Sequence, residues 1–294
     1  LIASTGVIGE ILDNQKINQL LPSLVKNLGK ASLADAAKAI MTTDKQAKFA
    51  KTTCQIEDVT YQIWGIAKGV GMIEPNMATT LSYFFTDAPI AQPSLENAFK
   101  QAIAKSFNAI SVDSDSSTND MSLIFSLADK ALPAAKLEDS NFQANLDKIT
   151  FDLAKAIILD GEGATKLIKV QVNHAKTAIE AKKIGKAIIN SPLVKTAIFA
   201  QDANCGRIIM AIGKSASAIN LANFNLTFNK GEIILIKNGQ LSDNYQEAKL
   251  NQYLKNSQIE IEIDMGLENP AGNFLVMGCD LSYDYIKINA EYRS

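Results

Sequence analysis

The sequence from residue 68 to residue 81 reads Lys68-Gly69-Val70-Gly71-Met72-Ile73-Glu74-Pro75-Asn76-Met77-Ala78-Thr79-Thr80-Leu81. Its glycines and the Pro75-Asn76 pair are turn-forming residues, so the stretch predicts a stiff loop. An apolar run begins at Leu81, which predicts a buried element directly after the loop. A threonine held at this boundary can attack the carbonyl group that precedes it. Cleavage between Ala78 and Thr79 would leave Thr79 with a free α-amine beside its hydroxyl, an arrangement used for nucleophilic catalysis.

The composition is that of a globular protein with a substantial core. The chain has 294 residues and 31.8 kDa, enough for one large domain or two lobes, and 47% of its residues are hydrophobic. The net charge of −2 and the pI near 5.6 give no electrostatic case for a nucleic-acid partner. No apolar run of about 18 residues occurs, so no membrane span is expected. The chain starts at Leu1 without a methionine, and we expect a fragment or a processed form.

The cysteines and the histidine give no sign of a metal site. Cys54, Cys205 and Cys279 are scattered and lack zinc-ligand spacing, which favours reduced thiols, a cytoplasmic protein and no bound metal. His174 lies in an alternating run, and we interpret it as a strand residue rather than as part of a Ser-His-Asp triad.

Periodicity predicts a mixture of helices and strands. Helical spacing covers residues 17–28, 32–41, 93–103, 140–158, 176–190, 206–212 and 244–254. Strand patterns cover residues 56–67, 108–112, 167–172, 194–200, 224–237 and 258–278. The polar residues 113–120 predict a loop that caps a further helix. The order has no strict βαβ rhythm, which favours an α/β fold with helices packed on antiparallel or mixed sheets.

Several motifs, in order along the chain, resemble those of the ornithine acetyltransferase family, also called glutamate N-acetyltransferase. They are Ala3-Ser4-Thr5-Gly6-Val7-Ile8-Gly9, Ile40-Met41-Thr42-Thr43-Asp44, residues 68–81, residues 112–120, Asp160-Gly161-Glu162-Gly163-Ala164-Thr165-Lys166, residues 204–208, Cys279-Asp280-Leu281-Ser282-Tyr283-Asp284-Tyr285 and residues 288–294. Each motif is weak alone, but together they span the chain and are specific.

The resemblance implies a self-processing enzyme of arginine biosynthesis. Its expected fold is a four-layered α-β-β-α-type arrangement with mixed sheets, similar to N-terminal-nucleophile enzymes. Cleavage would divide the chain into an α part, 1–78, and a β part, 79–294, which assemble as an α2β2 heterotetramer. The reaction would move the acetyl group of N2-acetylornithine to glutamate without a cofactor. Acetyl-CoA is a further possible donor.

The resemblance also implies the site residues. Thr79 would be the nucleophile, Ala78–Thr79 the cleaved bond, and Thr5 and Gly6 the oxyanion hole. The expected substrate contacts are Lys68, Thr79, Glu162, Asn289, Ser294 and one threonine of the Thr42-Thr43 pair, with Thr42 preferred.

These residue types suit acyl transfer between amines. The amine of an N-terminal Thr79 can serve as base, because an α-amine has a reference pKa of about 7.7–8.0. Thr5-Gly6 offers a hydroxyl and an unhindered backbone N–H to an oxyanion. Lys68 can pair with a substrate carboxylate, and Glu162, between two glycines, can pair with the amine of an ornithine side chain.

The chain also departs from the family pattern. From the resemblance we expect a further section before Ser4-Thr5-Gly6 that supplies strands to the core, and this sequence begins at Leu1. Cys205 stands where a tryptophan is usual, and Ser294 where a threonine is usual. Two alternatives therefore stay open. One is an N-terminal-nucleophile amidohydrolase or aminopeptidase, and the other is a catalytically inactive fragment that binds or assembles.

Overall fold

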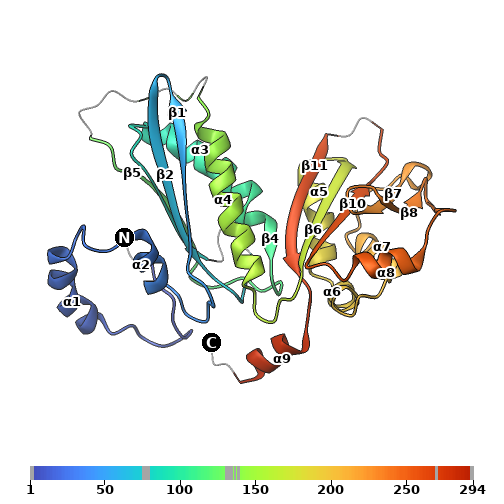
Figure 1. Cartoon of the computed structure of the whole chain (residues 1–294), viewed down its shortest axis with the longest axis horizontal. Coiled ribbons are helices and arrows are strands. Elements are labelled where there is room, and N and C mark those ends of the chain that lie inside the picture. The colour runs from blue at the N-terminus through green and yellow to red at the C-terminus, as the bar shows by residue number, and fades with distance from the viewer. Residues whose placement is uncertain are drawn as a thin grey trace. The chain divides into compact units, whose positions relative to one another are not determined.

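The computed structural model describes residues 3–74, 80–129, 135, 137, 140–268 and 271–291 (Figure 1). The chain divides into two compact units. The first comprises Leu1–Asn108, Ser116–Asp160 and Asn289–Ser294, and the second comprises Ala109–Asp115 and Gly161–Ile288. Each unit has its own sheet and its own helices.

The first unit is built on a mixed four-stranded sheet of order β1-β2-β3-β5. Its strands are β1 (Lys48–Ile56), β2 (Val59–Lys68), β3 (Leu81–Thr86) and β5 (Met121–Ser126). β1 and β2 form an antiparallel hairpin, β2 and β3 are antiparallel, and β3 and β5 are parallel. In this sheet Lys68 pairs with Leu81, so the two ends of the 68–81 stretch lie side by side.

The helices α2 (Leu33–Ala39), α3 (Gln92–Lys105) and α4 (Phe142–Leu159) pack against this sheet. The helix α1 (Asn14–Lys26) has no buried residue and does not cover the sheet. α4 lies along β1 and β2 and packs beside α3 (Figure 1). Gly65 allows this approach, because a β-carbon there would lie only 2.7 Å from Leu153 of α4. Ser32 and Asp35 form a capping box at the start of α2.

The second unit is built on a mixed seven-stranded sheet of order β4-β11-β6-β10-β7-β8-β9. The strands are β4 (Ile110–Ser111), β6 (Leu167–Ala175), β7 (Asn225–Phe228), β8 (Ile233–Lys237), β9 (Gln240–Leu241), β10 (Gln258–Asp264) and β11 (Gly272–Cys279). β6 is parallel to β10 and antiparallel to β11. Alternate side chains of β6 and β10 are fully buried, which places the core on one face of the sheet.

The helices of the second unit are α5 (Ala178–Ile189), α6 (Pro192–Phe199), α7 (Cys205–Lys214), α8 (Glu247–Tyr253) and α9 (Tyr283–Ala290), whose last two residues belong to the first unit. α5 packs on β6 and β11 and contacts α6 and α7. Gly185 of α5 fits against Val276 of β11, where a β-carbon would lie 2.7 Å from that side chain.

The expectation of an α/β fold with mixed sheets is confirmed, but two predicted segments are wrong. Residues 194–200 were expected to form a strand and instead belong to α6, which begins after the N-cap Ser191 with Pro192 in its first turn. The polar loop 113–120 was expected to cap a helix and instead leads into strand β5. His174 lies in β6 as expected, with Nδ1 2.9 Å from a carboxylate oxygen of Asp264.

Among the described residues, no helix is long and apolar enough to cross a membrane.

Candidate active site

The first unit holds a buried network of three charged side chains beside the start of the 68–81 loop. Lys48 Nζ lies 2.7 Å from Asp44 Oδ1 and 2.6 Å from Asp160 Oδ2. The three side chains are only 2%, 0% and 8% exposed in that order. Burial favours the neutral carboxyl form of Asp44, but hydrogen bonds from Lys48 and from two backbone N–H groups outweigh it. They hold the pKa of Asp44 below its ordinary value.

This network fixes the backbone on both sides of it. Asp44 accepts a hydrogen bond of 2.8 Å from the N–H of Gly69 and one of 3.2 Å from the N–H of Thr42. Asp160 accepts hydrogen bonds of 3.1 and 3.4 Å from the N–H groups of Lys45 and Gln46. The predicted contacts Thr42 and Lys68 are thus tied to one carboxylate, Thr42 directly and Lys68 through the residue that follows it.

Gly69 is required by its conformation. Its φ is +145°, which L side chains rarely adopt. A β-carbon there would lie 3.0 Å from Ile73 and 3.1 Å from Thr80. The glycine therefore allows the chain to leave β2 close to the start of β3.

Lys68 is a buried cation beside this turn, with 9% of its surface exposed. Burial lowers the pKa of its ammonium group, and Asp44 and Asp120 act in the opposite direction. Since Asp44 is already bonded to Lys48, the charge of Lys68 is less fully compensated than that of Lys48. An incompletely compensated buried cation suits an anionic group of a ligand.

Asp120 and Lys68 each shift the pKa of the other group. Burial raises the pKa of Asp120 to about 6, although hydrogen bonds from Ser117 and the charge of Lys68 lower it. Its Oδ2 atom is buried and has no hydrogen-bond partner among the described residues. Neither Asp120 nor the pair formed by Lys48 and Asp160 was predicted as part of the site. Asp120 and Asp160 both lie in motifs that resemble the family, 112–120 and 160–166, and this was the sequence signal that could have indicated them as site residues.

The predicted oxyanion residues Thr5 and Gly6 lie in an irregular segment of the first unit. Thr5 is half-buried and Gly6 is exposed. Asn119 donates a side-chain hydrogen bond to the carbonyl oxygen of Ser4. The residue before Thr5 is therefore attached to the residue before Asp120, which brings this segment to the loop that carries Asp120.

Glu162 belongs to the second unit and is buried, with 8% of its surface exposed. The next residue, Gly163, has φ +68°, and a β-carbon there would lie 2.4 Å from the backbone nitrogen of Tyr285. Burial and the carboxylates of Asp113, Asp115 and Glu162 raise the pKa of Tyr285. Glu162 thus belongs to an acidic group of side chains, and an opposite charge nearby would favour the ionised forms.

The remaining predicted residues are placed less fully. Asn289 is exposed in the last turn of α9 and is grouped with the first unit. Ala78, Thr79 and Ser294 lie outside the described residues. Within the part of the chain that the structure describes, no three His, Cys, Asp or Glu side chains form a group that could hold a metal ion.

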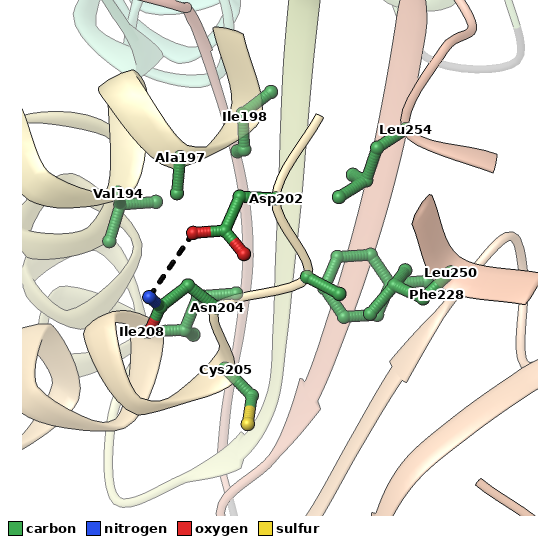
Figure 2. A pocket seen from close by; sticks show the side chains of 11 residues that line it. Val194, Ala197, Ile198, Asp202, Asn204, Cys205, Ile208, Phe228, Leu250 and Leu254 are labelled. Carbon is green, nitrogen blue, oxygen red and sulfur yellow. Dashed lines mark hydrogen bonds between the residues drawn. The ribbon is translucent and has the colours of Figure 1, made fainter. Parts of the chain in front are cut away.

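A pocket in the second unit holds none of the predicted site residues. Figure 2 shows aliphatic side chains around it, with Asp202 and Asn204 joined by a 3.2 Å hydrogen bond. Cys205, which stands where the resemblance has a tryptophan, also lines it. Its mostly apolar lining does not suit small charged substrates.

The fold and the site define a mixed α/β protein with a buried, charged site where two paired strands are joined by a turn-rich loop. The ArgJ family model matches residues 1–294, and the chain belongs to the ArgJ family.

Individual relatives agree with this assignment. The Arginine biosynthesis bifunctional protein ArgJ of Ruegeria pomeroyi is 44% identical over 292 residues, which cover 99% of this chain and 70% of that protein. The protein of the same name from Mesorhizobium japonicum is 44% identical over 301 aligned residues, covering 100% of this chain and 72% of the relative. The crystal structure of ArgJ from Bacillus halodurans is 36% identical, with a TM-score of 0.63. The match covers 70% of this chain and 96% of that one.

Proposed function

We propose that the chain is an acetyltransferase of arginine biosynthesis, which moves the acetyl group of N2-acetylornithine to glutamate through an acetyl-Thr79 intermediate. The observation that carries the proposal is the match to the ArgJ family over all 294 residues. The charged groups of the first unit support it, since they flank the loop that contains Thr79.

The first step of the proposal is self-cleavage between Ala78 and Thr79. The Thr79 hydroxyl oxygen attacks the carbonyl carbon of Ala78, and the C–N bond breaks to leave an ester and a free α-amine. Water then hydrolyses the ester, which gives Ala78 a carboxylate and restores the Thr79 hydroxyl. The ladder from Ile63↔Thr86 to Lys68↔Leu81 supports continued association, because it would join the 1–78 and 79–294 parts in one sheet after the cut.

The second step is acetyl transfer. The Thr79 hydroxyl, deprotonated by its own α-amine, attacks the acetyl carbon of N2-acetylornithine, and ornithine leaves with a proton on its α-nitrogen. The α-amine of glutamate then attacks the acetyl-threonine ester and frees Thr79. Thr5 and Gly6 would stabilise the oxyanion in both halves.

The other predicted residues would bind substrate. Lys68 suits the α-carboxylate, and Glu162 suits the side-chain ammonium group of ornithine. Asn289, Ser294 and one residue of the Thr42-Thr43 pair complete the predicted contacts. No cofactor is needed for this chemistry.

Acetyl-CoA is a candidate second donor, because its thioester carbon can be attacked by the same hydroxyl. We also propose an α2β2 assembly and a cytoplasmic location. The three free cysteines are compatible with a reducing compartment.

Intact mass spectrometry tests the proposal. Cleavage should give fragments of 78 and 216 residues, about 8 and 23 kDa by proportion. Incubation with N2-acetylornithine should add about 42 Da, one acetyl group, to the larger fragment. Release of free acetate with no transfer to glutamate would favour the amidohydrolase alternative. An uncleaved chain that never gains the acetyl group would favour the inactive fragment.

A further inference from the structure

The loop that carries Asp120 and the first residue of β5 are hydrogen-bonded to Glu74 and to Thr80, which precede and follow the proposed cleavage site in the sequence. Ser116 pairs with Ile73 in a β-bridge, and its hydroxyl donates a 2.8 Å hydrogen bond to the carbonyl oxygen of Glu74. At the other end, the N–H of Met121 donates a 2.9 Å hydrogen bond to the carbonyl oxygen of Thr80. Asp120 precedes Met121, so it stands beside Thr80 at the start of the parallel β3–β5 pair.

Lys68 and Asp120 are opposite charges that influence each other without forming an ion pair. Each shifts the pKa of the other group. Among the described residues, however, the only ion pairs of this region join Lys48 to Asp44 and to Asp160. Within the part of the chain that the structure describes, Lys68 therefore lacks an ion-pair partner, and the buried Oδ2 atom of Asp120 lacks a hydrogen-bond donor.

A free α-amino acid carries this pair of groups on one carbon atom. Its α-carboxylate is a partner for the Lys68 ammonium group, and its α-ammonium group is a donor for Asp120. Such a ligand would compensate two partly buried charges at once, which neither a dicarboxylate nor a simple amine can do.

We propose that Asp120 binds the α-nitrogen of the substrate amino acid and is the group that exchanges a proton with it. This inference rests on the proposed function and deepens it, because the reacting atom in both half-reactions is an α-nitrogen. Thr80, whose carbonyl oxygen accepts the hydrogen bond from Met121, directly follows the proposed nucleophile Thr79 in the sequence.

The proton balance follows from this role. Glutamate enters as an ammonium ion and gives one proton to the Asp120 carboxylate, so that its neutral nitrogen can attack the acetyl ester. The nitrogen loses its second proton as the amide forms, and that proton goes to the departing Thr79 oxygen. In the next turnover Asp120 returns that proton to the released ornithine amine, which leaves as an ammonium ion. No other co-reactant is needed.

The groups that face Asp120 suit a proton carrier near neutral pH. They are Ser117 on its own loop and Lys68 on β2, and Lys68 is itself faced by Asp44 and Lys48. Burial raises the pKa of Asp120 to about 6, nearer to working pH than that of an ordinary aspartate.

The test measures the effect of Asp120 on the attacking amine separately from its effect on formation of the acetyl-threonine ester. Wild type and Asp120→Asn are loaded with acetyl groups from p-nitrophenyl acetate, whose leaving group needs no proton. They are then chased with glutamate or with hydroxylamine, which has no α-carboxylate and is largely neutral at pH 7. We expect Asp120→Asn to load normally and to react with hydroxylamine within threefold of wild type. With glutamate the variant should be slower by about 100-fold, the lower end for general acid–base catalysis.

Matched controls make the outcome decisive. Asp58→Asn, an exposed carboxylate in the turn between β1 and β2, should match wild type in both chases. Equal losses, or no loss, with the two acceptors in Asp120→Asn would overturn the role of Asp120. If wild type itself never loads on Thr79, the proposed function fails instead.

A second measurement needs no variant. In a crystal structure of the cleaved wild-type protein with glutamate, we expect an Asp120 oxygen within about 3.2 Å of the glutamate α-nitrogen. A separation beyond about 4 Å with no bridging water would overturn the proposal, even if Asp120→Asn fails to fold or to cleave.

Discussion

Lys48 Nζ lies 2.6 Å from the Oδ2 atom of Asp160, although the two residues are 112 positions apart in the chain. This contact joins the first residue of β1 to the residue that ends α4. Lys48 also contacts Asp44, and Asp44 accepts a hydrogen bond from the N–H of Gly69. The end of α4, the start of β1 and the turn after Lys68 are therefore linked by one set of contacts.

Replacing Lys48 with methionine should destabilise the first unit strongly. The variant would leave two buried carboxylates without their shared cation, and breaking a buried ion pair in this way costs about 3–5 kcal/mol. Urea denaturation followed by tryptophan fluorescence measures the change, since Trp64 lies in β2. Lys16→Met is the control, because the Lys16–Asp13 pair is 3.7 Å long and exposed. Similar midpoints for the two variants would show that the network is not a stability determinant.

Gly69→Ala should also destabilise the protein. Alanine at φ +145° is strained, and its β-carbon would press on Ile73 and Thr80. The expected loss is about 1–3 kcal/mol in the free energy of unfolding. Gly213→Ala is the matched control, because Gly213 lies in α7 with nothing within 4 Å of the added carbon. That change should stabilise by roughly 0.5–1 kcal/mol. A neutral Gly69→Ala would contradict the need for glycine there.

The stability of the uncleaved Thr79→Ala chain should depend on pH through Asp120. The pKa of Asp120 is about 6 in the folded chain, against 3.8 for an ordinary aspartate, so the folded chain binds the proton more tightly than the unfolded chain does. The contribution of Asp120 to stability is therefore highest at low pH, decreases as the pH rises from about 4 to about 6, and is then constant.

Asp120→Asn removes this dependence. In the Thr79→Ala background, the free energy of unfolding of the double variant relative to its parent should be greater at about pH 7.5 than at about pH 4. Denaturation curves at the two pH values measure it. A difference of the opposite sign would mean that the Asp120 carboxylate is stabilised, rather than penalised, by its surroundings.

Glu162→Gln should discriminate between donors. The change removes the negative charge expected to pair with the ornithine side chain and keeps the shape of the residue. We expect KM for N2-acetylornithine to rise about tenfold, a loss of about 1.4 kcal/mol, while loading from p-nitrophenyl acetate stays within twofold. Steady-state kinetics with both donors test this. Equal losses with the two donors would contradict a side-chain contact.

Local sequence signals located most of the elements but not all of them. The capping box of Ser32 and Asp35 and the periodicity of α4 and α5 were sufficient, because those helices are specified by their own residues. The error at 194–200 arose because the branched apolar residues there suit a strand. The Ser191-Pro192 start of a helix was the stronger signal.

Longer-range features could not be predicted from spacing. β5 pairs in parallel with β3, and the connection between the two strands contains α3. Because its partner strand is distant in the sequence, no local turn pattern indicated that the loop 113–120 leads into a strand. The contact of Lys48 with Asp160 could not be predicted either, because the two residues are 112 positions apart and no local sequence pattern links them. Family motifs indicated Lys68 and Glu162, whereas the orphaned oxygen of Asp120 became visible only in the structure.

The central claim is that Thr79 becomes the first residue of its own polypeptide and then carries the acetyl group. Edman sequencing of the larger fragment from purified, active protein tests it most directly. We expect the sequence Thr-Thr-Leu-Ser, from Thr79 to Ser82, with the Thr79→Ala variant giving one uncut chain of 31.8 kDa. Active protein that stays uncut, or a larger fragment that starts at any other residue, would contradict the account.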